Sequence, residues 1–311
     1  TEYPIKVQVI DEAGNIGEIS KEISTQADSA GAYILASANR PTGQTTDWTG
    51  QTTYYYTGNP NNWVQFAGFW WRIIRINGDG SIRMIYQGTS ANETGTGTQI
   101  GTSTFNDTHG ENAYVGYMYT SGDRQGTGTS STIKSLLDTW YQNNIANYGE
   151  YIDGNAGFCG DRRTSSGSGV WDFDTYYKPY TRITNNNPSL SCNKNDIYTT
   201  KESDTGNRAL TQPIGLISAD EAMFAGIPND GIGNQDSYLY TELSYWTISP
   251  YYFTSPSNDF VFNIYSSGCF SADYVHRPFV YGVRPVINLR SNVSLTGSGT
   301  TTDPFKVVGA S

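Results

Sequence analysis

Positive charge is scarce in this sequence. Only 19 of its 311 residues are Lys or Arg, against 29 Asp and Glu, so the formal net charge is −10. Proteins that bind nucleic acid use clustered Lys and Arg to neutralise phosphate groups. We therefore expect no nucleic-acid partner for this chain.

Long apolar runs are missing as well, and no basic segment followed by an apolar stretch stands at the start. A helix that crosses a bilayer needs about 20 predominantly apolar residues in a row. The sequence therefore predicts no direct membrane insertion. We expect the chain to start after any signal peptide or inside a longer protein.

Histidine and cysteine, which supply most zinc ligands and many nucleophiles, occur only two and three times. His109 and His276 are far apart in the sequence and have no neighbouring Cys or His, which argues against a zinc site. No phosphate-binding Gly-rich loop and no G-x-S-x-G motif occurs. Paired carboxylates remain open, because any fold can assemble them. We interpret the chain as a binding module with no catalytic residues, no metal site and no cofactor, apart from a possible structural calcium.

Two of the three cysteines, Cys159 and Cys192, flank a polar, loop-like region that has little else to hold it together. We predict a disulfide between them, which stabilises the fold by roughly 3 to 4 kcal/mol on the chain-entropy estimate. Disulfides persist in oxidising compartments, so we expect an extracellular or cell-surface location. Cys269 is then left as a partly buried thiol.

The residues that are abundant, above all Gly, Ser, Thr, Asn and Tyr, favour a loop-rich chain that leans towards β structure. Residues 1–26 alternate as a hairpin, with a turn at 11–15. Helices are predicted at 27–39, at 131–147 and after the capping-box pattern Ser218-Ala219-Asp220-Glu221.

A meander of three strands is predicted over 63–86, and its arginines, Arg72, Arg75 and Arg83, are expected to stay in water or to pair with acids. Residues 77–81 are similar to a calcium loop but lack its later ligands, so we interpret them as a turn. A buried strand is predicted at 214–217. Residues 112–119 are either a strand or a packing segment, and the region between Cys159 and Cys192 is interpreted as turns.

The stretch 251–281, YYFTSPSNDFVFNIYSSGCFSADYVHRPFVY, has the composition of a binding surface. Aromatic rings with a polar tip give large contact areas at low conformational cost, and short polar side chains adapt their hydrogen bonds. Pro, Ser-Gly and Asn-Asp steps break it into loops, which lie on surfaces. The alternative is an aromatic β-hairpin in a core.

Five blocks taken together resemble a bacterial surface-protein domain with a C-type lectin-like fold, related in architecture to formylglycine-generating enzymes: WWRIIRINGDG (70–80), FCGDR (158–162), PIGLISADE (213–221), YWTISP (245–250) and GVRPVINL (282–289). This resemblance implies an α+β fold with two main helices, short antiparallel sheets and long loops over 27–308. Residues 1–26 resemble the end of a bacterial immunoglobulin-like repeat, whose V-x-V-x-D-x-x-G-N pattern they match from Val7 to Asn15.

A narrower resemblance is to the variable proteins of diversity-generating retroelements. Adenine-directed mutagenesis of AAY codons in that class never yields Lys, Glu, Gln, Met or Trp, and none of these five occurs between Thr247 and Phe305. Strand alternation then predicts that Phe262, Ile264, Phe270 and Val275 face the core. The complementary positions form the predicted ligand surface: Tyr251, Tyr252, Phe253, Asn258, Asp259, Tyr265, Ser271, Asp273, Tyr274, His276, Arg277 and Phe279.

The resulting hypothesis is a non-catalytic adhesin- or receptor-type domain that binds a protein or glycan on another cell or a phage. One alternative is a calcium-dependent glycan-binding lectin, although the Glu-Pro-Asn and Gln-Pro-Asp tripeptides of such lectins are absent. The other is an enzyme of the formylglycine-generating type, although no motif matches its paired-cysteine site.

Overall fold

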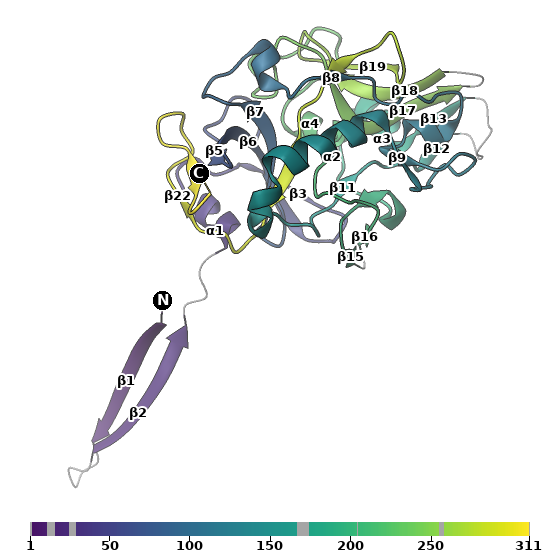
Figure 1. Ribbon diagram of the computed structural model, residues 1–311. Helices are drawn as coiled ribbons and strands as arrows, with labels where there is room; N and C mark the ends of the chain where they lie inside the picture. Colours follow the sequence, from purple (N-terminus) through teal and green to yellow (C-terminus); the bar gives the residue numbers. More distant parts are fainter. Residues whose placement is uncertain are drawn as a thin grey trace.

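The computed structural model describes residues 2–10, 16–24, 29–166, 174–203, 205–254 and 258–310. The first two segments form a two-stranded antiparallel sheet of β1 (Glu2–Ile10) and β2 (Ile16–Ser24), which confirms the predicted hairpin. Its predicted turn lies outside the described residues. Neither β1 nor β2 pairs with any other described strand (Figure 1). The origin of this hairpin in an immunoglobulin-like module stays a prediction.

The predicted meander is the centre of an eight-stranded sheet, which we call the framework sheet. Its path is β21-β7-β6-β5-β23-β22, and β4 joins β3 to β6. All but one residue of β5 and β7 are buried, and so is most of β6, because both faces of the sheet are covered. Its strands are β3 (Gly43–Thr46), β4 (Thr52–Tyr55), β5 (Trp63–Phe66), β6 (Phe69–Ile76), β7 (Ile82–Gly88), β21 (Val286–Leu289), β22 (Leu295–Thr296) and β23 (Phe305–Val307).

A second sheet, which we call the face sheet, follows the path β12-β13-β17-β18-β19, and β20 pairs with β17 on one side and with β8 on the other. It contains most of the aromatic stretch that the sequence singled out. Its strands are β8 (Thr102–Ser103), β12 (Thr164–Ser166), β13 (Thr175–Tyr177), β17 (Tyr245–Thr254), β18 (Asn258–Ile264), β19 (Phe270–Tyr274) and β20 (Tyr281–Gly282). Three short pairs complete the β structure of the described residues: β9 (Met118–Tyr119) with β10 (Thr129–Ser130), β11 (Phe158–Cys159) with β14 (Ile197–Tyr198), and β15 (Glu202–Ser203) with β16 (Gly206–Asn207).

All three predicted helices are present among the described residues: α1 (Ala30–Leu35), α2 (Thr132–Asn144) and α4 (Ala219–Phe224). Ser131 caps α2, and Ser218 with Glu221 forms the predicted capping box at α4. The helix α3 (Lys178–Thr184) was not expected. The described part of the chain also has 3-10 turns at η1 (Gly95–Thr98), η2 (Asn112–Val115), η3 (Ala146–Tyr151) and η4 (Lys194–Asp196).

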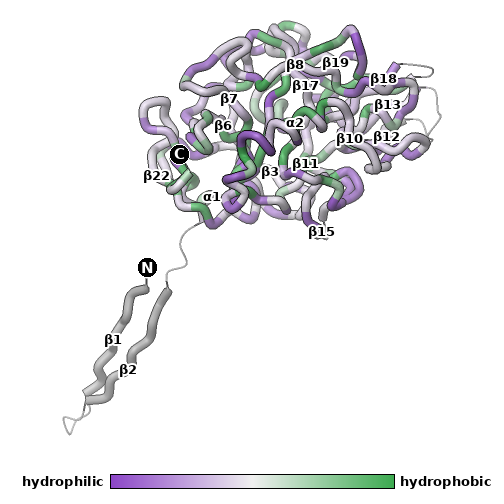
Figure 2. Tube along the Cα trace, in the orientation of Figure 1, coloured by the Kyte–Doolittle hydropathy of each residue, from purple (hydrophilic) through white to green (hydrophobic). Residues whose placement is uncertain are grey.

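One hydrophobic core joins the two sheets and the helices, and the protein is of the α+β class. Figure 2 shows hydrophobic segments gathered in the interior around β6, β7 and β17. Helix α2 packs on the framework sheet through Trp140, whose ring lies 5.4 Å from Phe69 and 5.7 Å from Tyr86. Among the described residues no helix is long and apolar enough to cross a membrane.

One of the smaller predictions needs correction, and the structure decides between the two alternatives of another. Residues 214–217 are buried as expected, but they form a single bridge between Gly215 and Val286 rather than a strand. Residues 112–119 begin as the 3-10 turn η2 and become extended only at β9. Both segments lie against the core, where packing rather than a regular ladder holds them.

The arginines of the meander are buried, so the expectation that they stay in water is wrong and the expectation of acid partners holds for two of them. Arg75 and Arg83 both bind Glu221, with an Nε–Oε1 distance of 2.9 Å for Arg75. Arg72 instead lies 4.1 Å above the Trp63 ring and donates to the carbonyl of Pro60. The capping residue of α4 therefore also neutralises buried charge from the framework sheet.

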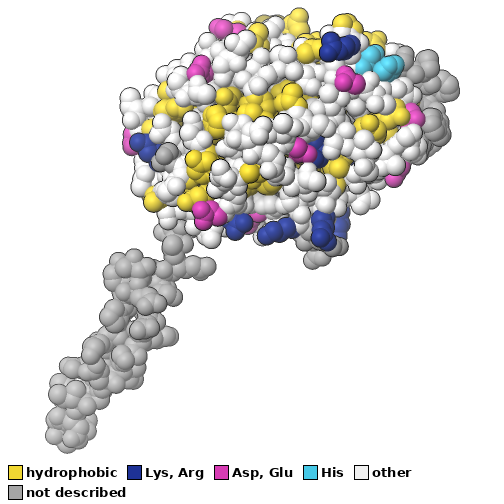
Figure 3. Space-filling model, in the orientation of Figure 1, with side chains coloured by type: hydrophobic (Ala, Val, Ile, Leu, Met, Phe, Trp, Pro, Cys, Tyr) yellow, Lys and Arg dark blue, Asp and Glu magenta, His cyan; other side chains and the backbone are white. Residues whose placement is uncertain are grey.

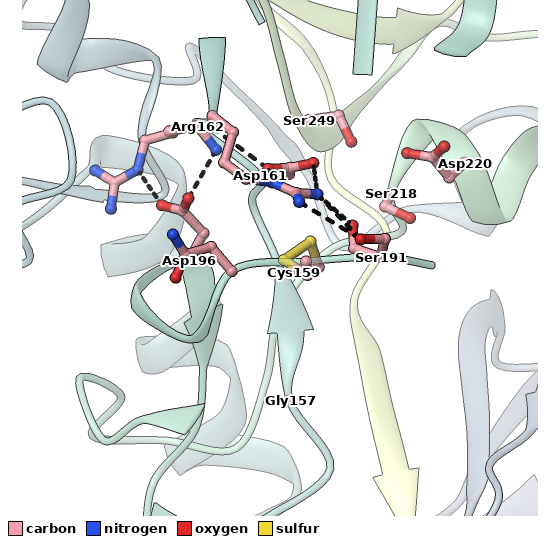
Figure 4. The surroundings of a disulfide bond; sticks show 12 residues. Gly157, Cys159, Asp161, Arg162, Ser191, Asp196, Ser218, Asp220 and Ser249 are labelled. Carbon is pink, nitrogen blue, oxygen red and sulfur yellow. Dashed lines mark hydrogen bonds and ion pairs between the residues drawn. A yellow bond between two sulfur atoms is a disulfide. The ribbon is translucent and has the colours of Figure 1, made fainter. Parts of the chain in front are cut away.

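The predicted disulfide is confirmed: Cys159 and Cys192 are joined across 33 residues. Buried charges surround it (Figure 4). Arg162 binds the Asp196 carboxylate at 3.0 Å, and Arg182 bridges Asp161 and Asp220 at 2.7 Å each. Together with the Glu221 cluster these contacts make what we call the ionic scaffold. Cys269 is a free thiol, as predicted, and it is buried rather than partly buried.

Candidate functional site

Four aromatic side chains from four neighbouring strands form a row on the outer side of the face sheet. Tyr176 on β13, Tyr252 on β17, Phe260 on β18 and Tyr274 on β19 follow one another across the sheet. Their ring centroids are separated by 4.4 Å, 5.9 Å and 4.4 Å in turn. We call these four residues the aromatic row. All four are half-buried, so each presents part of its ring to solvent.

Strand register explains why the four rings meet. Tyr176 lies opposite Tyr252, Tyr252 opposite Phe260, and Phe260 opposite Tyr274. Residues that are directly opposite across strands point to the same face and lie close enough for their rings to touch. A β-bulge between Pro250 and Tyr252 adds one residue to β17 and so turns Tyr252 outward.

Further rings extend the row on both sides. Tyr180 on α3 and Tyr251 lie 5.1 Å apart beside Tyr176, and Phe279 lies 5.3 Å from Tyr274. We call the row and these three residues the aromatic face. Figure 3 shows hydrophobic side chains and histidine at the surface near β18 and β19.

A hollow of about 460 Å³ lies beside the row. Its floor consists of the buried rings of Phe262 and Phe270, whose centroids are 5.8 Å apart. Asn229 supplies a polar group at its wall. Concave sites that combine aromatic side chains with polar groups are typical of ligand binding.

One tyrosine hydroxyl group of the aromatic face forms a hydrogen bond within the protein. The Tyr252 hydroxyl donates to the Asp174 carboxylate. Partial burial raises the pKa of Tyr251 and of Tyr252, and hydrogen bonding to Asp174 raises that of Tyr252 further. The two phenols therefore stay neutral and act as hydrogen-bond donors or acceptors at physiological pH.

The structure brings part of the predicted surface together. Tyr251, Tyr252, Tyr274, Phe279 and His276 meet on or beside the aromatic face. Arg277 is exposed beyond His276, but no ring contact joins it to the row in the described part of the chain.

Four other predicted residues are not members of the row. Tyr265 is 46% exposed but follows the far end of β18, about 17 Å from Phe260 at the usual rise per strand residue. Asp273 accepts hydrogen bonds from Asn263 and Tyr281, both at 2.9 Å. Ser271 lies beside the hollow, and Asn258 opposes Thr254 at the other end of β18.

Two predicted ligand-binding residues, Phe253 and Asp259, are buried, and their assignment to the surface is wrong. They oppose each other on the inner side of the sheet, behind Tyr252 and Phe260. The four residues predicted as core, Phe262, Ile264, Phe270 and Val275, are indeed buried. Phe262, however, shares the outer face with Phe260 and is covered by Tyr251 at 4.9 Å.

Sequence reasoning missed three aromatic residues of this face. Phe260 was not assigned to the surface because Phe262 was predicted to face the core, and residues two apart in a strand share a face. Tyr176 and Tyr180 lie before the aromatic stretch, in the region interpreted as turns, although the run Tyr176-Tyr177 followed by Pro179-Tyr180 was a visible aromatic signal.

The two histidines, which are far apart in the sequence, are neighbours in the structure. The rings of His109 and His276 stack with centroids 3.9 Å apart and planes 20° from parallel. Among the residues that the structure describes, no group of three or more His, Cys, Asp and Glu side chains is arranged to hold a metal ion. Residues 77–81 form a turn, as predicted, in which the Asp79 carboxylate accepts hydrogen bonds from the backbone N–H and the hydroxyl of Ser81.

A larger hollow, of about 730 Å³, lies between α1 and residues 291–295. Small Ala and Ser side chains make up much of its lining, and Tyr33 is its one aromatic residue among those described. We prefer the aromatic face as the candidate site because rigid rings contribute most of the energy at binding surfaces.

Comparisons of the chain with protein-family models, with curated proteins and with solved structures found no match.

Proposed function

We propose that this chain is a non-catalytic ligand-binding domain of a bacterial secreted or surface protein, and that its aromatic face contacts a protein or glycan. The single observation that carries the proposal is the aromatic row, in which four half-buried rings lie side by side on one sheet. Clusters of partly exposed aromatic rings are typical of interaction surfaces.

Rigid rings favour binding for a physical reason. A tyrosine presents a large area through only two rotatable bonds, so little conformational entropy is lost when a ligand covers it. In the row each ring is already held by its neighbours, which lowers that loss further. We expect Tyr252 and Phe260, at its centre, to be hot spots with losses of about 2 kcal/mol or more on truncation to alanine.

The C-type lectin-like fold and the diversified stretch belong to the same proposal. The α+β class, the short antiparallel sheets and the outward rings within 251–281 support it. The neighbouring genome tests the diversification part: a reverse transcriptase and a near-identical template repeat are expected there. Their absence contradicts diversification but leaves the binding surface as it is.

The two alternatives stay predictions and are separated from this proposal by simple measurements. A calcium-dependent lectin loses binding in EDTA, whereas we expect this domain to keep its affinity for its ligand. An enzyme of the formylglycine-generating type needs reactive thiols, but Cys159 and Cys192 are joined to each other within the ionic scaffold.

The binding proposal is tested with two probes, a random-peptide phage library and a printed glycan array. Both are screened against the unaltered protein and against a variant in which Tyr252 and Phe260 are changed to Ser. We expect the ligands that are selected on the unaltered protein to bind the variant at least tenfold more weakly, because each lost hot spot contributes more than about 1.4 kcal/mol.

Tyr33→Ser is the matched control, because Tyr33 is a 40% exposed tyrosine outside the aromatic face. Its affinity for the same ligands is expected to equal that of the unaltered protein. Equal losses in the control and the face variant contradict the assignment of the site, and so does full affinity in both. Circular dichroism establishes that each variant is folded.

A further inference from the structure

One buried carboxyl group of the face sheet is covered by a loop. Asp259 on β18 has no exposed surface, and its Oδ1 atom has no hydrogen-bond partner among the residues that the structure describes. Its Oδ2 atom accepts a hydrogen bond of 2.6 Å from the backbone N–H of Gly110. Gly110 belongs to residues 104–111, which we call the latch segment. The latch segment therefore separates this carboxyl group from water.

The latch segment also touches β19 and the residues that follow it. The backbone N–H of Asn106 donates to the carbonyl of Val275 at 2.9 Å, and the His109 ring stacks on His276. The His276 ring lies 5.8 Å from Tyr274, the last residue of the aromatic row. A movement of the latch segment would therefore displace His276 and, through it, change the contact with Tyr274 at the end of the row.

An ionised carboxylate with one unpaired oxygen is unfavourable in such a place. Burial raises the pKa of Asp259 to about 7, although the Gly110 hydrogen bond lowers it, and the negative charge of Glu111 raises it further. When the loop is open and water reaches the carboxyl group, its pKa returns to the ordinary value near 3.9.

We propose that residues 104–111 form a pH-operated latch, which closes over Asp259 when this carboxyl group is protonated and opens when it ionises. A group whose pKa is higher in the closed state favours that state most at low pH. The free energy by which protonated Asp259 favours the closed state is fully present below the ordinary pKa of an aspartate and is lost as the pH rises through about 7.

The other titratable groups around the latch modify this behaviour without reversing it. Burial lowers the pKa of His276 and the facing His109 lowers it further, so protonation of His276 opposes closure at acid pH. Tyr177 on β13 stays neutral, because burial and the charge of Asp259 both raise its pKa. Within the latch segment, Asp107 accepts a hydrogen bond from Thr104, and Glu111 from Ser121 and Gly122.

Hydrogen exchange of the Gly110 amide tests the latch without any ligand, so the result does not depend on the proposed binding function. In the unaltered protein we expect the protection factor, corrected for intrinsic exchange, to fall about tenfold between pH 6.0 and 8.5, as linkage predicts for this shift. In Asp259→Asn, which keeps the acceptor oxygen and the shape but not the charge, protection is expected to stay constant.

Equal falls in the unaltered protein and in Asp259→Asn overturn the proposal, and so does constant protection in both. If Asp259→Asn does not fold, carboxyl ¹³C titration of the unaltered protein decides: a midpoint near 7 that coincides with a shift of the Gly110 amide supports the latch. A midpoint near the ordinary value of about 4 overturns it. His276→Phe keeps the ring stack and is expected to retain the loss of protection at high pH.

Discussion

The aromatic face and the ionic scaffold hold their side chains in opposite ways. In the scaffold, Glu221 is buried and is fixed by two arginines and by its own helix cap. In the face, Tyr252 and Phe260 are half-buried and are held mainly by neighbouring rings. Each scaffold position therefore requires one particular partner, whereas a face position requires a ring of suitable size. Changes in the scaffold should affect folding, and changes in the face should affect binding.

The largest loss of stability is expected from Glu221→Ala. This change leaves Arg75 and Arg83 buried without their acid, and removing one partner of a buried ion pair costs about 3 to 5 kcal/mol. Urea unfolding measures the loss in free energy of unfolding. Glu150→Ala, at an exposed glutamate, is the control and should change stability by less than about 0.5 kcal/mol. A small loss for Glu221→Ala would mean that the scaffold tolerates unpaired charge.

Removal of the disulfide should have the next largest effect. Changing Cys159 and Cys192 together to Ser is expected to lower the free energy of unfolding by about 3 to 4 kcal/mol, because the open chain gains entropy when it unfolds. Thermal unfolding with and without reductant provides the measurement. Reductant should destabilise the unaltered protein and leave the double variant as it is. Equal stability of the two proteins in oxidising buffer contradicts this prediction.

The smallest effect on stability is expected in the aromatic row, and one strand offers a matched pair. Phe260→Ala should cost about 1 kcal/mol, since a half-exposed ring loses mainly its ring contacts. Phe262→Ala, two residues along β18 on the same face, should cost about 3 kcal/mol or more because Phe262 is buried. Urea unfolding of both variants gives the comparison, and equal losses would place the row in the core.

Local patterns predicted the centre of the framework sheet, helix α2 and part of the ionic scaffold well. The meander, the α2 stripe and the capping box of Glu221 depend on residues that are close in sequence, and the disulfide was inferred from two cysteines that flank a polar region. The arginine partners were only partly foreseen, because burial of Arg72, Arg75 and Arg83 depends on layers that pack on both sides of the framework sheet.

The face was harder to predict because its geometry depends on register and on distant segments. The bulge at Pro250–Tyr252 reverses the alternation of β17, so Phe253 points inward. On β18, residues of both faces are buried, so apolar character at Phe262 did not reveal which side is inner. The contacts of Tyr176 with Tyr252, and of His109 with His276, join segments that no short-range pattern connects.

The most direct test of the central claim is a hydrogen-exchange footprint of a peptide or glycan selected on the unaltered protein. We predict that the bound ligand slows amide exchange along β17, β18 and β19 around the aromatic row, and leaves the scaffold around Glu221 unchanged. Protection that is confined to the hollow between α1 and residues 291–295, with none at the row, would contradict the account.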